Sequence, residues 1–104
     1  MRATKENIIT FLQELKPQLL KDGINNLALF GSFATNSQGV YSDIDIAIGK
    51  ENDFLINNSS YSYFDTISEI KEKIRKKFHR NIDIIDLDSN SSLLDSIKKD
   101  LIYV

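Results

Sequence analysis

Apolar residues recur along the chain with two different periods, and the change from one period to the other separates helices from strands. The first set is spaced four, three and four residues apart, which is the pattern of one helical face. Its members are Ile8, Leu12, Leu15 and Leu19. This spacing predicts a helix over residues 4–21, with Thr4 as its N-cap and its end near Gly23. Pro17 lies inside the pattern and removes one backbone hydrogen bond, so we expect a kink or a break there.

Two short apolar runs, at 27–30 and 44–48, predict buried strands, because both are too short for helices and the second is rich in isoleucine. Asn25 and Asn26 precede the first run, and we expect them to form the turn into it. Residues 34–42 are mostly small and polar, which is typical of a loop or of one helical turn.

The second half of the chain continues the alternation. Residues 50–62 are rich in asparagine and serine, so they are either a plain connection or a segment that covers a ligand. As a plain loop they would pack the apolar Phe54, Leu55 and Ile56 onto the domain. Residues 63–80 have helical apolar spacing and predict a second amphipathic helix. Its expected buried face comprises Phe64, Ile67, Ile70, Ile74 and Phe78.

The last part of the chain predicts a third strand at 81–87, a short helix at 89–99 and a closing edge strand at 101–104. The expected caps of that helix are Ser89, Asn90 and Ser91, and its apolar residues are Leu93, Leu94 and Ile97. The alternation of helices and strands predicts an α/β fold, a small mixed β-sheet with helices packed on it. With 104 residues, we expect one domain spanning 1–104.

The composition narrows the class of protein. Hydrophobic residues make up 41% of the chain and charged residues 27%, which is typical of a globular domain. Without a membrane-length apolar run or a signal-peptide core, we expect a cytoplasmic protein with no membrane partner. The chain has no cysteine and a single histidine, His79, so a metal ion would be held by oxygen ligands. A net charge of −2 argues against direct nucleic-acid binding through bulk positive charge.

One local basic surface is nevertheless predicted, on the polar side of the helix at 63–80. In its last ten residues the cations outnumber the single acid, Glu72. These cations are Lys71, Lys73, Arg75, Lys76, Lys77 and Arg80. The run is either a solvated face that complements the helix dipole or a site for a polyanion or a partner.

Two aspartates and a Gly-Ser pair suggest a site for a cation and a phosphate. Asp43 and Asp45 are two residues apart on a predicted strand, so their carboxylates share one face and repel each other. A divalent cation with oxygen ligands would relieve that repulsion. Alternatively, Asp43 caps a turn and Asp45 faces solvent on an edge strand. Gly31 and Ser32 follow the first strand, where a backbone without Cβ and a nearby helix start suit a phosphate.

Together, these residues match the signature G-S-x10-D-x-D, formed by Gly31-Ser32 and Asp43-Ile44-Asp45. The chain resembles the minimal nucleotidyltransferase (MNT) family of the DNA polymerase beta-like superfamily. The resemblance implies the polymerase beta-like fold, ATP as substrate and two Mg²⁺ ions. It implies catalytic and metal-binding roles for Asp43, Asp45 and Asp83, and nucleotide-binding roles for Gly31, Ser32 and Ser42.

Strand parity and the resemblance together identify Asp83 as the third of the expected metal-binding carboxylates. Parity places Asp83 and Asp86 on opposite faces of the strand at 81–87. The family pattern has a carboxylate early in this strand followed by two apolar residues, which Asp83 matches. Asp86 is then expected to end the strand. The chain departs from the family at Thr35 and Asn36, where relatives often carry Arg-Gly, and this puts tight or ATP-selective binding in doubt.

The resemblance also implies an activity and a partner. MNT proteins are commonly paired with a helical HEPN protein in toxin–antitoxin modules, where the MntA-type antitoxin transfers AMP to a toxin tyrosine. The leading hypothesis is therefore an antitoxin with protein adenylyltransferase (AMPylation) activity in a hetero-oligomer. Two alternatives stay open. One is a non-catalytic antitoxin that neutralises its partner by binding; the other is a catalytic subunit acting on a small molecule or RNA with a separate substrate-binding subunit.

Overall fold

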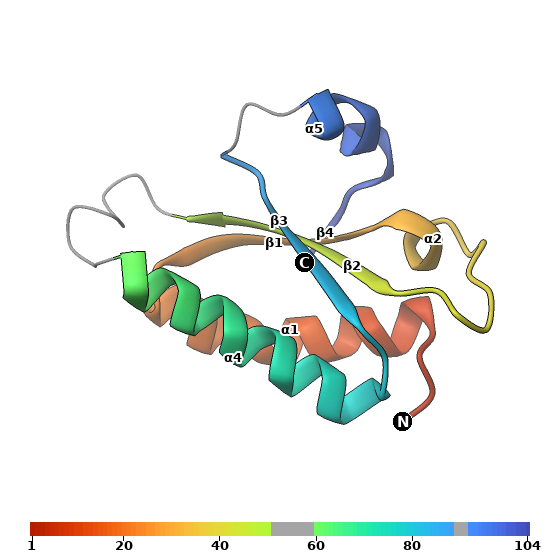
Figure 1. Ribbon diagram of the computed structural model, residues 1–104, viewed down its shortest axis with the longest axis horizontal. Helices are drawn as coiled ribbons and strands as arrows, with labels where there is room; N and C mark the ends of the chain where they lie inside the picture. The colour runs from red at the N-terminus through yellow and green to blue at the C-terminus, as the bar shows by residue number, and fades with distance from the viewer. Residues whose placement is uncertain (51–59, 89–91) are drawn as a thin grey trace.

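A four-stranded mixed sheet organises the fold (Figure 1). The computed structural model describes residues 1–50, 60–88 and 92–104. The strands are β1 (Ile24–Phe30), β2 (Ile44–Lys50), β3 (Ile82–Asp86) and β4 (Ile102–Tyr103). Their order across the sheet is β3-β2-β1-β4, with β2 and β3 parallel and the other two pairs antiparallel. The predicted mixed sheet is confirmed, and the last strand pairs at an edge as expected.

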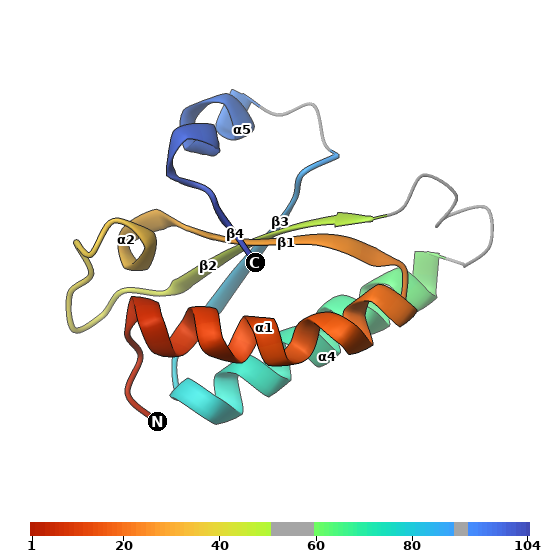
Figure 2. The ribbon, with the colours of Figure 1, turned by 180° about the vertical axis from the view of Figure 1, so that it is seen from behind.

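Helices cover the two faces unequally, as Figures 1 and 2 show. The two long helices, α1 (Lys5–Lys21) and α4 (Ser60–Phe78), pack on one face of the sheet. On the other face lies α5 (Ser92–Ile97), which continues into a short 3₁₀ helix, η1 (Lys98–Asp100). A one-turn helix, α2 (Gly31–Ala34), follows β1 at one end of the sheet. The smaller helical cover leaves part of the α5 face available for a site.

The first helix begins where the sequence predicts. Thr4 is the N-cap of α1, and its side chain accepts a hydrogen bond from the backbone N–H of Asn7. Of the kink or break expected at Pro17, the break is wrong, because α1 runs through this residue to Lys21; the kink stays a prediction. Pro17 is exposed, so solvent can satisfy backbone groups near it while the buried Leu12 and Leu19 hold the helix on the sheet.

The main core lies between the sheet and the two long helices. It contains Ile8 and Leu12 of α1, Ile70 and Ile74 of α4, and isoleucine and leucine side chains from β1, β2 and β3. The α5 face has a smaller apolar cluster. That cluster comprises Ala28, Phe30 and Ala47, with Ile85, Leu87, Ile97 and Leu101 packed against it. Strand alternation thus separates a large apolar face from one that also carries polar residues.

Two local expectations are wrong. Asn25 and Asn26 lie within β1, with a register irregularity between Ile24 and Asn26, and not in a turn. The turn is instead at Asp22 and Gly23, where Gly23 takes a left-handed φ of 90°. Phe64 is 64% exposed, because the inward position of the first described turn of α4 is occupied by Tyr63.

Some predictions fall outside the described residues. These are residues 51–59 of the connection expected at 50–62, including Phe54, Leu55 and Ile56, and the helix caps at 89–91. The two ends expected for this connection are wrong, because Lys50 belongs to β2 and residues 60–62 belong to α4. Among the helices in the described ranges, none combines the length and apolar character needed to cross a bilayer.

Candidate active site

The Gly-Ser pair is positioned by the end of β1. Gly31 is the first residue of α2 and has φ of 74°, in the left-handed region that glycine adopts without a Cβ penalty. Phe33, two residues further on, is fully buried in the main core and anchors this short helix. The predicted strand-ending turn is therefore confirmed, and Ser32 lies between two fixed residues.

The Asp-x-Asp pair is positioned by β2. Asp43 immediately precedes this strand, and Asp45 is its second residue. In the sheet, Asp45 pairs with Phe30 of β1 on one side and with Asp83 of β3 on the other. Because β2 and β3 are parallel and these two residues are in register, both carboxylates project to the α5 face. The sheet thus brings the predicted third carboxylate, Asp83, beside Asp45.

The charge on Asp45 is disfavoured by its surroundings. Partial burial is the largest cause that raises the pKa of this carboxyl above its ordinary value, followed by the negative charges of Asp83 and then Asp43. Each like charge makes ionisation of Asp45 less favourable. The three carboxylates therefore interact electrostatically, and a cation bound among them would be stabilised.

Gly31 lies directly against Asp45. A Cβ on Gly31 would be 2.1 Å from Oδ2 of Asp45 and 2.9 Å from its Cγ. Real Cβ atoms do not approach other atoms this closely, so a side chain at residue 31 would displace the carboxylate. The two halves of the sequence signature are therefore in contact, and this contact requires a glycine.

The fit of this site to Mg²⁺ depends on its donor atoms. In the described ranges, no three His, Cys, Asp or Glu side chains are arranged so that they could hold one ion together. Protein sites for Mg²⁺ commonly use only one or two carboxylates and complete the octahedron with water and substrate phosphates. The carboxylate oxygens of Asp43, Asp45 and Asp83 are of the donor type that Mg²⁺ uses in this way, and a bound triphosphate would supply the further oxygen ligands.

Two open clefts adjoin these residues, with volumes of about 360 and 400 Å³. Both are lined by Asp43, Arg75 and Asn81. Ser42 lines the smaller cleft and Asp83 the larger. Each volume falls in the range of small-ligand sites, roughly 300 to 1,000 Å³. Asp43 is therefore accessible from two sides.

Ser42 has a defined local role. Its Oγ accepts a hydrogen bond of 2.8 Å from the backbone N–H of Gly39, and its own N–H donates to the Gly39 carbonyl. This turn delivers the chain to Asp43. Contact of Ser42 with a nucleotide stays a prediction.

The two residues that depart from the family pattern differ in their effect. Asn36 has φ of 57°, a left-handed conformation that asparagine tolerates better than most residues, so it can replace a glycine in the backbone. Thr35 directs its hydroxyl to the carbonyls of Gly31 and Ser32 and to the hydroxyl of Ser37. Thr35 therefore supplies local hydrogen bonds but no positive charge.

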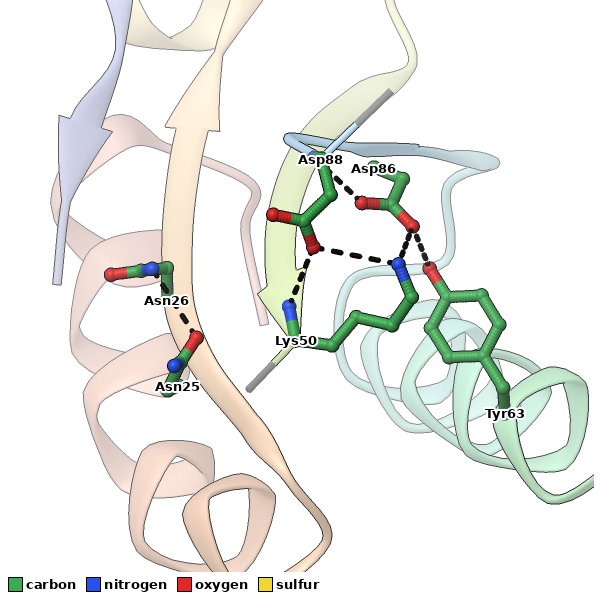
Figure 3. Close-up of polar contacts among 6 residues, drawn as sticks. All are labelled: Asn25, Asn26, Lys50, Tyr63, Asp86 and Asp88. Carbon is green, nitrogen blue, oxygen red and sulfur yellow. Dashed lines mark hydrogen bonds and ion pairs between the residues drawn. The ribbon is translucent and has the colours of Figure 1, made fainter. Parts of the chain in front are cut away.

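Asp86 belongs to a different part of the fold. Its Oδ2 lies 2.6 Å from the Nζ of Lys50 and accepts a hydrogen bond of 2.8 Å from the Tyr63 hydroxyl (Figure 3). Burial acts to raise the pKa of Asp86, but hydrogen bonds from Lys50, the Asp88 backbone and Tyr63 outweigh it and lower the pKa. Because Tyr63 belongs to α4, Asp86 faces the long helices, away from Asp83. The predicted parity of this strand is confirmed, and Asp86 is its last residue as expected.

The basic run of α4 divides into residues with different surroundings. Arg75 forms an ion pair with Glu72, at 2.6 Å, on an exposed surface. Arg80 lies beyond the helix end and contacts the loop before Asp43. In the sequence, Arg80 belongs to the same basic run as the other cations, because no local signal distinguishes a cation that bonds a distant loop from one that faces solvent.

A mixed sheet with adjacent strand carboxylates and a glycine turn against them is an arrangement suited to nucleotidyl transfer. The chain belongs to the Polymerase beta, Nucleotidyltransferase family, whose sequence pattern matches residues 6–104. This membership confirms the fold class and the superfamily that the signature indicates.

One named relative and one solved structure are similar to most of the chain. A protein of Methanocaldococcus jannaschii that bears the provisional name protein adenylyltransferase MJ1379 is 37% identical over 91 residues, which cover 84% of this chain and 85% of that protein. A crystal structure of a toxin–antitoxin with AMP-PNP matches with a TM-score of 0.54 and 25% identity, covering 88% of this chain and 64% of that one. The chain thus spans less than two thirds of that protein.

A second solved structure shares the fold. It is a toxin–antitoxin MntA–HpeT crystal structure of a mutant with two aspartate-to-glutamate substitutions. Its TM-score is 0.60 at 20% identity, and the match covers 97% of this chain and 72% of that one. This match confirms the fold, and the family membership confirms the predicted nucleotidyltransferase recognition.

Proposed function

We propose that this nucleotidyltransferase is a Mg²⁺-dependent protein adenylyltransferase, which moves AMP from ATP to a tyrosine of a HEPN-type toxin and thereby acts as its antitoxin. The observation that carries the proposal is the contact of Gly31 with Asp45, which is in register with Asp83. This geometry joins a phosphate-accommodating turn to a carboxylate cluster. The name of the M. jannaschii relative and the toxin–antitoxin assemblies support the choice of reaction and partner.

Each residue has a role that suits its position. Asp43 and Asp45 would hold the metal, and Asp83 would complete the set nearest the acceptor and help to take the hydroxyl proton. Gly31 and Ser32 would bind the departing phosphates through backbone N–H groups and the serine hydroxyl. When bound, two Mg²⁺ ions supply charge neutralisation and hold the attacking and leaving oxygens in line.

The acceptor comes from a partner in this proposal. Catalysis by proximity requires the acceptor hydroxyl to be held about 3 to 3.5 Å from the phosphorus that it attacks. The clefts beside Asp43 are open, and a docked protein can present a tyrosine there directly. Mass spectrometry of the partner toxin, mixed with this protein, ATP and Mg²⁺, tests the proposal. We expect the partner to gain the mass of one or more adenylates, and to gain none with Asp43→Asn.

One observation favours a second candidate, the antitoxin that acts by binding alone. Thr35 uses its hydroxyl within α2 and brings no cation to the phosphate turn, so nucleotide binding would be weaker than with arginine. A tight complex whose partner keeps its original mass in the same experiment would favour this candidate over catalysis.

A further inference from the structure

Arg80 joins two segments that are distant from it in sequence. One of its terminal nitrogens donates hydrogen bonds to the carbonyl of Ser42, at 2.7 Å, and to that of Val40, at 3.2 Å. The centre of its guanidinium group also lies 5.1 Å from the ring centroid of Phe33. Arg80 therefore contacts the loop before Asp43 and the helix that contains Ser32.

These contacts lie at the two ends of the spacer between the halves of the signature. Phe33 directly follows Ser32, and Ser42 directly precedes Asp43. The other hydrogen bonds described for this spacer, such as Ser37 to Ser32, are local. Arg80 thus connects the two ends of the spacer from a separate part of the fold, and we call this connection the tie.

The chain places Arg80 there through an unusual helix end. His79 has φ of 56°, and its N–H donates to the Arg75 carbonyl at 2.7 Å. A left-handed residue at this point ends α4 and turns the chain toward β3. The next hydrogen bond, from the N–H of Ile44 to the Asn81 carbonyl at 3.0 Å, joins β2 to the same connection. Arg80 is therefore held beside the start of β2.

We infer that Arg80 is a positioning residue, which fixes the Gly31-Ser32 turn relative to Asp43 by holding both ends of the spacer. Its planar guanidinium can face the Phe33 ring while donating to two carbonyls, which a lysine ammonium does less well. The importance of Arg80 for catalysis rests on the proposed function, whereas its contacts with the two ends of the spacer do not.

Amide hydrogen exchange tests the tie without any ligand. In Arg80→Met, we expect the Ser42 and Ile44 amides to exchange faster by about tenfold or more, because charged hydrogen bonds hold the loop closed. The buried Ile74 serves as an internal reference whose exchange stays unchanged. Lys76→Met, which removes one exposed positive charge from α4, the helix that precedes Arg80, is the matched control and should leave Ser42 and Ile44 unchanged. Arg80→Lys should fall between wild type and Arg80→Met.

Two results would overturn the inference. One is unchanged exchange at Ser42 and Ile44 in Arg80→Met. The second result concerns Mg²⁺-dependent ATP binding, measured by calorimetry. We expect about tenfold weaker ATP binding for Arg80→Met and no such loss for Lys76→Met. Faster exchange in Arg80→Met together with unaltered ATP binding would overturn the inference. Should Arg80→Met fail to fold, Arg80→Lys gives the same comparison. If the wild type binds no ATP, the proposed function fails, and the exchange result alone decides whether Arg80 holds the spacer.

Discussion

Gly31 and Asp45 share one small space, so each residue restricts what the other can be. Gly31 combines a left-handed φ with a contact that leaves no room for a Cβ. Both features depend on the folded chain, which is why the sequence predicts a tight turn at Gly31 but not its contact with Asp45. A motif of spaced residues can indicate that those residues lie close together in the fold, whereas the distance between them is set by packing.

We expect Gly31→Ala to lower the free energy of unfolding by about 1 to 3 kcal/mol, from backbone strain and from the collision with Asp45. Gly39→Ala is the matched control, since a Cβ there would have no neighbour within 4 Å, and it should change stability by less than about 0.5 kcal/mol. Denaturant unfolding measures both. Asp45→Ala should partly rescue Gly31→Ala, and strictly additive losses would contradict the proposed collision.

The like charges of Asp43 and Asp45 lead to a second prediction at the residue scale. Replacing Asp43 and Asp45 by Asn removes charges that oppose each other on one face. In buffer without divalent ions, the double variant should therefore unfold at a temperature equal to or above that of the wild type. Under catalytic conditions, it should transfer no AMP. Transfer at the wild-type rate would show that these residues are not the catalytic carboxylates.

At the scale of elements, the two ends of the β2–β3 pair differ in their electrostatics. Near the start of the strands, the like charges of Asp45 and Asp83 oppose each other. At their end, the Lys50 side chain bonds Asp86, and the Lys50 backbone N–H donates to Asp88 (Figure 3). Tyr63 of α4 also donates to Asp86, so this contact extends to the helix. The side chains of Lys50 and Asp86 are only 14% and 24% exposed, so their ion pair is less screened than a surface pair.

We expect Lys50→Met to destabilise the protein by about 1 to 3 kcal/mol at pH 7, because Asp86 keeps its charge without its closest cation. Lys98→Met is the control, since its ion pair with Asp95 has exposed side chains and should contribute less than about 1 kcal/mol. The lowered pKa of Asp86 sets the pH dependence. Its stabilisation is present above the ordinary aspartate pKa, about 3.9, and is lost as pH falls through the lower folded value.

Thermal unfolding of both variants across the acidic range measures this dependence. The difference between Lys50→Met and wild type should shrink as the pH falls and Asp86 is protonated. A difference that stays constant over this range would show that the lysine acts by packing and not by its charge.

Elements with a local pattern could be predicted from the sequence, and tertiary contacts could not. The spacing in α1 and the parity of β3 identify the buried faces, because each depends on residues close in sequence. The break expected at Pro17 and the burial expected of Phe64 are wrong, because packing of α1 and the rotation of α4 on the sheet decide them. Arg80 is the clearest omission, since its partners are about forty residues away.

At the scale of the whole molecule, the sheet supplies a site that is open on both sides of Asp43. We therefore expect the isolated protein, given ATP and Mg²⁺, to release pyrophosphate slowly, and the partner toxin to raise that rate sharply by supplying the acceptor. A coupled pyrophosphate assay measures both rates. An equal rate without the partner would point to water or a small molecule as the acceptor.

The proposed catalytic site comprises Asp43, Asp45 and Asp83, of which Asp45 and Asp83 project to the α5 face. This assignment is tested most directly by comparing AMP transfer to the partner by Asp83→Asn and Asp86→Asn, two substitutions on opposite faces of one strand. We predict a loss of about 100-fold or more for Asp83→Asn, and for Asp86→Asn only the loss that its lower stability explains. A larger loss from Asp86→Asn, with Asp83→Asn close to wild type, would contradict the assignment.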